Sequence, residues 1–248
     1  ACIGSALFGF FASLAALRVG DIYLAAVLLI LGEILRIVAR NYSPLVGGTV
    51  GLVGVPNPFS FIRDPTLSSL MYALFLGAIA FCVFFYLGRL EGSPFGRLLR
   101  AIRDNEETAR SLGKKIFGVK GRVMFIGSAI AGLAGALYTY YLGAVNADDF
   151  IPYMTFEAWI IVVLGGSGNN TGVVIGALFV TVLDRVIRII SQTPTMQAMA
   201  IEVNYVRYIL EGIVMILFIA YRTSGIVPEE PIKTPAQEVF EVPTSRGT

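Results

Sequence analysis

The feature that most constrains this chain is an uncharged run of twenty residues, Ser68–Leu87, most of which are apolar. A helix of that length spans about 30 Å, the thickness of the hydrocarbon core of a bilayer. Val123–Leu142 is a second uncharged run of the same length. Of the 248 residues, 56% are hydrophobic and 15% are charged, whereas soluble domains carry about 25% charged residues. The sequence therefore predicts an integral membrane protein.

Other apolar runs predict further membrane segments. They are Ala1–Leu17, Ile22–Val38, Phe156–Leu164, Val173–Ile190 and Tyr205–Tyr221. Phe156–Leu164 is too short to cross as a helix and leads into the glycine-rich Gly165–Gly172, so a broken or re-entrant segment is expected there. The predicted fold class is all-α, a polytopic transmembrane helical bundle. Residues 1–222 form the membrane domain, and residues 223–248 form a tail that is extended or disordered.

The distribution of charge predicts the topology. Residues 89–122 contain nine of the 19 Lys and Arg residues and only four acidic ones. Loops rich in Lys and Arg stay in the cytoplasm, so this loop is expected on the cytoplasmic side of a cell membrane. Counting the membrane crossings that follow it places the C-terminus on the same side. The inferred outer loops agree, because Gly143–Tyr153 and Ser191–Asn204 contain no Lys or Arg and Asn41–Pro65 contains only Arg63.

Several kinds of chemistry are excluded by what the sequence lacks. There is no histidine, so catalysis or metal binding through imidazole is ruled out. No GxxxxGK[ST] loop occurs, so the chain does not bind ATP in that way. We expect no catalytic residue, no metal site, no cofactor on this chain and no nucleic-acid partner.

The basic loop contains an amphipathic stretch, Gly96–Gly113, that predicts one short helix. Four residues share a stripe, with Asn105 at the remaining turn: Leu98, Ile102, Ala109 and Leu112. Two interpretations are open on physical grounds. The helix either lies on anionic lipid head groups or fits a cleft on a soluble partner.

The amino-acid sequence of this loop resembles that of a transporter family. Glu107–Gly113 has the form E-x-A-x-x-x-G and resembles the E-A-A-x-x-x-G motif of ABC importer permeases, with Thr108 replacing the first alanine. Further segments between about Gly20 and Pro228 resemble permeases of branched-chain amino acid (leucine/isoleucine/valine) ABC importers. They are Tyr23–Arg36, Gly47–Leu52, Ser93–Glu106, Gly132–Tyr138, Val163–Gly168 and Tyr221–Glu229.

The resemblance implies a membrane-spanning permease subunit in a prokaryotic cell membrane. It works with a second permease, ABC ATPase subunits that hydrolyse ATP and an extracytoplasmic binding protein, so this chain is not itself an enzyme. Members usually carry more N-terminal spans, and we expect a longer protein. Urea or short amides remain alternative substrates, because Asn169–Thr171 and Thr223 depart from the pattern. An ion-driven secondary transporter and a lipid-binding membrane scaffold are rivals from other classes.

The candidate site residues form two groups. The resemblance implies contacts with the ATPase at Arg97, Arg100, Arg103, Asn105, Glu106, Glu107, Ala109, Leu112 and Gly113. The predicted substrate path contains Glu33, Gly47, Gly48, Thr49, Gly165, Gly166, Ser167 and Gly168. Glu33 either pairs with Arg36 at spacing i, i+3 or recognises the substrate amine. Gly165–Gly168 forms either a tight turn at one membrane face or part of the path.

Overall fold

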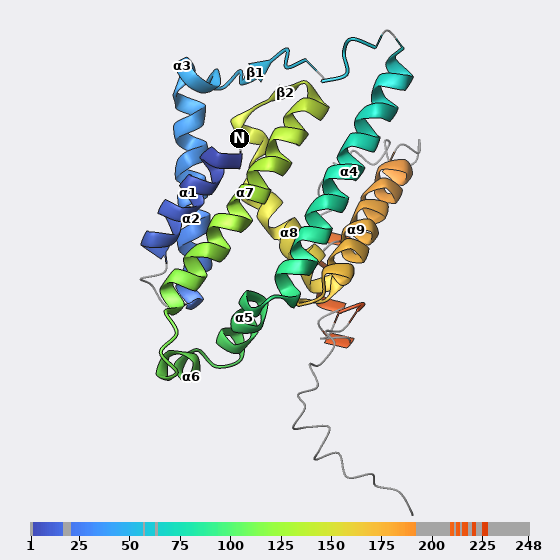
Figure 1. Cartoon of the computed structure of the whole chain (residues 1–248). Coiled ribbons are helices and arrows are strands. Elements are labelled where there is room, and N and C mark those ends of the chain that lie inside the picture. Colours follow the sequence, from blue (N-terminus) through green and yellow to red (C-terminus); the bar gives the residue numbers. More distant parts are fainter. Residues whose placement is uncertain are drawn as a thin grey trace, which may run out of the picture. The chain divides into compact units, whose positions relative to one another are not determined.

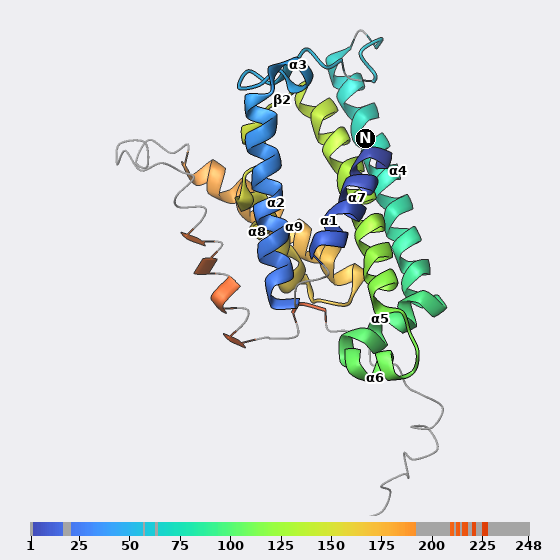
Figure 2. The ribbon, with the colours of Figure 1, turned by 90° about the vertical axis from the view of Figure 1, so that its left-hand side faces the viewer.

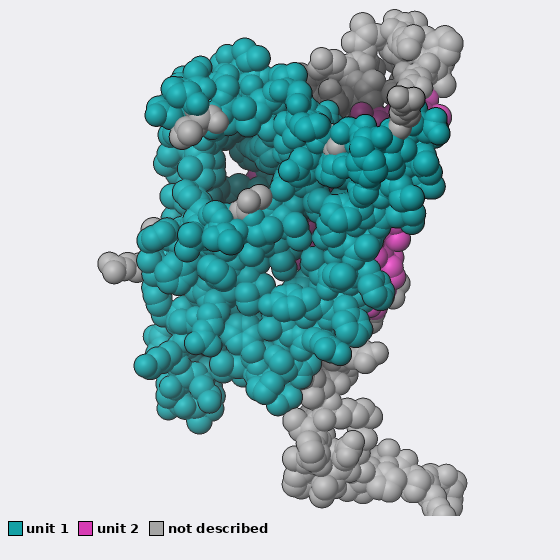
Figure 3. All heavy atoms as spheres, turned by 45° about the horizontal axis from the view of Figure 1, so that its top comes forward, with its two compact units in different colours: residues 1–155 teal, residues 156–248 magenta. Residues whose placement is uncertain are grey.

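The structure is a computed structural model that describes residues 2–16, 21–56, 58–62, 64–191, 209–210, 212–213, 215–217, 220–221 and 225–227. It divides into two compact units, Ala1–Thr155 and Phe156–Thr248, which are coloured separately in Figure 3. The elements, labelled in Figure 1, are α1 (Cys2–Ala16), α2 (Asp21–Asn41), α3 (Ser43–Val46), β1 (Leu52–Val53), α4 (Pro65–Gly92), α5 (Pro94–Asp104), α6 (Glu106–Ser111), α7 (Ile116–Leu142), β2 (Ala144–Val145), η1 (Ala147–Asp149), α8 (Pro152–Gly165) and α9 (Asn170–Ser191).

Two helices among the described residues, α4 and α7, are long and apolar enough to cross a membrane. In their most apolar windows only 6% and 0% of the residues are buried inside the protein. The core helix of a soluble protein would be mostly buried, so these side chains face lipid or another chain. Both helices extend beyond the predicted uncharged runs and include the charged residues at their basic-loop ends, Arg89 and Glu91 in α4 and Lys120 and Arg122 in α7.

Small side chains bring α1 against α7. A Cβ added at Gly9 would lie 1.8 Å from the hydroxyl of Ser128, and Ser13 is fully buried. Close backbone approach of this kind is how helices associate in lipid, where no hydrophobic effect drives them together. α4 is tied to α7 differently, because the Tyr72 hydroxyl donates to the Leu137 carbonyl at 2.6 Å.

The two ends of α4 and α7 carry different structures. At one end β1 pairs antiparallel with β2, with Leu52 opposite Val145 and Val53 opposite Ala144. α5 and α6 lie at the other end, as Figures 1 and 2 both show. The two loops predicted to be outside therefore meet each other, and the basic loop lies at the opposite end of the same helices.

The second unit contains most of α8 and all of α9. Its buried cluster is formed by Ile160, Leu164 and Val180, with Ile161 and Met215 packed against it. The predicted helix break falls between α8, which ends at Gly165, and α9, which begins at Asn170. Three further predictions fall mainly outside the described residues: the connection Ser191–Asn204, the span Tyr205–Tyr221 and the tail 223–248.

Candidate functional site

The basic loop, residues 89–122, folds as two helices instead of the single helix predicted over Gly96–Gly113. α5 ends at Asp104, and α6 begins at Glu106. Between them Asn105 is extended, and its side-chain oxygen accepts a hydrogen bond from the Thr108 amide at 2.9 Å. Asparagine is a favoured N-cap residue, because this bond satisfies an amide that has no partner inside the helix. The prediction of one continuous helix was therefore wrong at Asn105.

The apolar stripe of the basic loop is mostly turned inward. Ile102 and Ala109 are buried together with Ile116 and Val119 from the start of α7. Phe95, Leu98 and Leu99 pack against this cluster. Leu112 does not join it and is 73% exposed, because α6 ends at Ser111 and Leu112 lies past the helix.

The turn from α4 into α5 is fixed by Ser93 and Gly96. The Ser93 hydroxyl accepts from the amides of Phe95 at 3.2 Å and Gly96 at 3.4 Å. A Cβ at Gly96 would lie 2.0 Å from the Glu91 carbonyl oxygen, so this close turn requires glycine. The turn thus explains why Ser93 and Gly96 occur at these positions of the Ser93–Glu106 segment.

Ion pairs occupy several charges of the basic loop. Arg100 bonds Glu91, and Glu106 bonds both Lys120 at 2.7 Å and Arg110 at 3.0 Å. Arg103 lies 3.5 Å from Asp104. Among the nine residues predicted to contact an ATPase, four support the loop itself: Arg100, Asn105, Glu106 and Ala109.

The other five predicted contact residues are exposed. They are Arg97, Arg103, Glu107, Leu112 and Gly113. Gly113 follows α6 with φ of 75° and donates its amide to the Arg110 carbonyl at 3.0 Å. A left-handed glycine directly after the C-cap is a common way for a helix to end. Leu112 and Gly113 form the exposed tip of the loop.

A network of charged residues lies near the β1–β2 end of the first unit. Arg36 bonds Glu33 at 2.5 and 3.0 Å, so the predicted i, i+3 pair is confirmed. Arg36 also bonds Asp148 at 2.7 Å, and Arg40 lies 3.6 Å from the same carboxylate. Asp148 was not among the predicted site residues. The sequence did contain a signal for it, because Asp148 is an acidic residue in a loop without Lys or Arg, and it therefore needs a basic partner from another segment. Arg36 and Arg40 on α2 supply that partner.

Gly47–Thr49 lie at the same end. Gly47 caps α3 with φ of 75°, and the Thr49 carbonyl accepts from the Asn146 side chain at 3.0 Å. Asn146 caps η1, which contains Asp148. The turn around η1 thus contacts Thr49 through Asn146 and Arg36, the partner of Glu33, through Asp148.

The predicted path residues Gly165 and Gly166 form part of the glycine junction, defined as Gly165, Gly166, Gly172, Gly176 and Gly225. A Cβ at Gly165 would lie 2.2 Å from the Gly172 carbonyl oxygen, and one at Gly176 would lie 2.4 Å from that of Ile161. Gly165 and Gly166 are buried, whereas Ser167 and Gly168 are exposed. This geometry is a tight turn between packed helices, and the role of these residues in a substrate path stays a prediction.

A short piece of the C-terminal region completes the junction. The amides of Ile226 and Val227 donate to the carbonyls of Leu164 and Gly165 at 2.9 and 3.0 Å. Gly225 has φ of 73°, and a Cβ there would lie 2.4 Å from Gly166 Cα. The end of α8 thus has its last carbonyl groups satisfied by main chain that follows α9 by more than thirty residues.

Exposed apolar helices, a charged loop at one end and a paired loop at the other define a multi-spanning helical membrane protein. Comparison with known sequences makes this specific. The chain belongs to the family described as "Branched-chain amino acid transport system / permease component", which matches residues 1–219.

Individual relatives agree with the family. The chain is 35% identical over 216 residues to the probable branched-chain amino acid transport permease protein LivM of Methanocaldococcus jannaschii, covering 86% of this chain and 62% of the relative. It is 29% identical over 244 residues to the high-affinity branched-chain amino acid permease protein LivM of Escherichia coli, covering 89% and 54%.

A relative with a different named cargo also matches. The autoinducer 2 import system permease protein LsrC of Yersinia pseudotuberculosis is 28% identical over 153 residues, covering 60% of this chain and 43% of the relative. The chain spans 54% to 62% of the length of the two LivM proteins. No solved structure matches.

Proposed function

We propose that this chain is the membrane-spanning part of a permease subunit in an ATP-driven importer of branched-chain amino acids. Family membership and the names of the LivM relatives support this function. In this proposal a second permease completes the path, an extracytoplasmic protein delivers the substrate, and separate ATPase subunits hydrolyse ATP. The basic loop and the C-terminus face the cytoplasm, and the chain carries no cofactor.

The exposed tip of the basic loop is the observation that carries the ATPase assignment. Leu112 is 73% exposed, although Ile102 and Ala109 of the same loop are buried. A helix that lies on lipid needs its apolar stripe free to enter the membrane. Here Ile102 and Ala109 of the stripe are buried within the basic loop itself. Only Leu112 of the stripe is exposed, at the tip of the folded loop. That shape suits insertion into a pocket of a soluble subunit.

Movement of the tip has a direct route into the membrane. Ala109 on α6 and Ile116 on α7 belong to the same buried cluster, and α7 continues from there as a long apolar helix. In the proposed mechanism, ATP binding by the partner shifts α6, and the shared cluster carries α7 with it. The chain does no chemistry on its substrate.

The docking assignment is tested with Leu112→Ala in the assembled transporter. Phe117→Ala is the matched control, because Phe117 is another exposed apolar residue of the basic loop, at 48%. We expect Leu112→Ala to lower ATPase co-purification and leucine uptake about tenfold, the effect of losing one interface anchor. The control should change neither, and both variants should insert at normal yield. Normal ATPase capture and uptake by Leu112→Ala would overturn the assignment.

The substrate is tested separately by deleting the gene in its host. Uptake of labelled leucine, isoleucine and valine should fall, while uptake of urea and acetamide should not. The opposite pattern would replace amino acids by small amides and would leave the docking result intact.

A further inference from the structure

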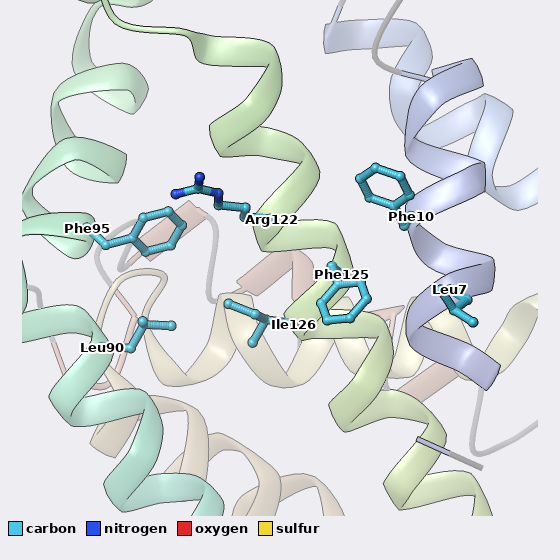
Figure 4. A pocket seen from close by; sticks show the side chains of 7 residues that line it. All are labelled: Leu7, Phe10, Leu90, Phe95, Arg122, Phe125 and Ile126. Atoms are coloured by element: carbon cyan, nitrogen blue, oxygen red, sulfur yellow. The ribbon is translucent and has the colours of Figure 1, made fainter. Parts of the chain in front are cut away.

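The first unit contains a cavity of about 450 Å³ that none of the roles above uses. It lies where α1, the end of α4, the start of α5 and the cytoplasmic-side turns of α7 meet (Figure 4). Pockets that hold small ligands commonly measure roughly 300–1,000 Å³, so the cavity is large enough to bind a molecule. Its apolar walls are Leu7, Phe10, Leu90, Phe95, Phe125 and Ile126.

One charged residue, Arg122, also lines this cavity. Figure 4 shows its guanidinium reaching from α7 toward Phe95, with Ile126 and Leu90 on the same side. Arg122 is an exposed residue, and it forms no ion pair or hydrogen bond within the described part of the chain. Nearby cations differ, because Arg100 and Lys120 bond Glu91 and Glu106. The cavity surface itself is apolar, and the exposed guanidinium of Arg122 lies at its edge, where it can attract an anion.

The position of Arg122 along α7 sets the depth of the cavity. Arg122 directly precedes the uncharged run Val123–Leu142, which spans the hydrocarbon core at about 1.5 Å per residue. The guanidinium is thus at the level of lipid head groups. Phe125 and Ile126 lie one helical turn deeper, at the level of acyl chains. Going deeper into the membrane, the charged residue comes first and the apolar residues follow, just as the head group of a lipid is followed by its acyl chains.

We propose that this cavity binds one anionic phospholipid of the surrounding membrane, with its phosphate at Arg122 and an acyl chain along Phe125, Ile126 and Phe10. Charge complementarity selects the occupant, because the exposed guanidinium attracts a phosphate and the apolar walls favour a hydrocarbon chain. Basic pockets between membrane helices on the cytoplasmic side are suited to anionic head groups. The proposal depends on insertion of α4 and α7 in a membrane and does not depend on which substrate is transported.

The test measures lipid retained by the purified full-length protein in native mass spectrometry. Phosphatidylglycerol and phosphatidylcholine are offered as equal mixtures before detergent is reduced. We expect the unmodified protein to retain one phosphatidylglycerol. Arg122→Ala should lower that retention roughly fivefold, the effect of one basic residue at an anionic surface. Arg89→Ala is the control, since Arg89 is an exposed cation at the end of α4 that does not line the cavity.

A second variant tests the apolar half without altering charge. Ile126→Trp fills the cavity and should displace the lipid although Arg122 remains. Equal retention by Arg122→Ala and Arg89→Ala, equal retention of the two lipids, or unchanged retention in Ile126→Trp would each overturn the proposal. Efficient crosslinking of two copies through Phe125→Cys would also overturn it, because the cavity would then be an interface between chains.

Discussion

The basic loop and the glycine junction both join helices, but they fill the space between them with different parts of the chain. In the basic loop, side chains of Ile102, Ala109, Ile116 and Val119 form the contact. In the glycine junction, the main chain of Gly165 touches that of Gly172. A smaller side chain in the basic loop lowers stability but can leave the fold intact. In the glycine junction, any added side chain would overlap the main chain.

This difference bears on what each joint can do. A joint built of side chains can repack, so its helices can shift relative to each other while remaining in contact. A joint built of main chain in contact with main chain has no rotamers to exchange. We therefore expect α5 and α6 to adjust their positions and α8 and α9 to keep their crossing fixed at the junction.

The largest effect is expected from Gly172→Val. The new Cβ would lie 2.4 Å from the Gly165 carbonyl oxygen, a main-chain atom that cannot rotate away. We expect a loss of about 3 kcal/mol, at the upper end of the usual cost of overpacking, measured by thermal unfolding in detergent. Gly77→Val is the control, because no atom outside its own helix lies within 4 Å of a Cβ there among the described residues. Similar melting of the two variants would show that the junction is not closely packed.

An intermediate effect is expected from Ile102→Ala. Ile102 is 8% exposed, so truncation leaves a cavity in the basic loop and should lower the free energy of unfolding by about 2 kcal/mol. Leu112→Ala removes a similar aliphatic side chain from the same loop but from an exposed position, and should leave stability unchanged. Equal destabilisation by both variants would contradict the inward and outward assignment of these residues.

The smallest effect is expected from Asn105→Ala. Loss of the bond to the Thr108 amide should cost about 1 kcal/mol of local stability, seen as faster hydrogen exchange at that amide. Asn105→Asp retains an N-cap oxygen and should restore slow exchange. Slow exchange in Asn105→Ala would mean that α5 and α6 are joined in some other way.

Local pattern predicted those features that local physics determines. The uncharged runs predicted α4 and α7, because a bilayer sets the length of apolar helix that it accepts. The amphipathic stripe correctly placed Ile102 and Ala109 inward. It failed at Asn105, where the helix breaks, because stepping through that residue at helical spacing ignored its chemistry. It also failed at Leu112, which lies past the end of α6. Asparagine followed by two glutamates is an N-cap signature, and it was readable in the sequence.

Other features depend on residues that are distant in the sequence. The glycines of Gly165–Gly172 predicted a break, but nothing local identifies Gly225 and Ile226 as the main chain that packs there. Asp148 was missed for the same reason, since its arginine partners lie on α2. A pattern within one segment shows that a residue needs a partner and does not say which residue supplies it.

The two-residue pairing of β1 with β2 has a consequence for biogenesis. Leu52 and Val145 are separated in the chain by both α4 and α7 and by the whole basic loop. Their hydrogen bonds cannot close until the second of these helices has been inserted, and closing so long a loop is entropically costly beforehand. Protection of these amides during synthesis would therefore mark the moment at which the helical hairpin has reached its final topology.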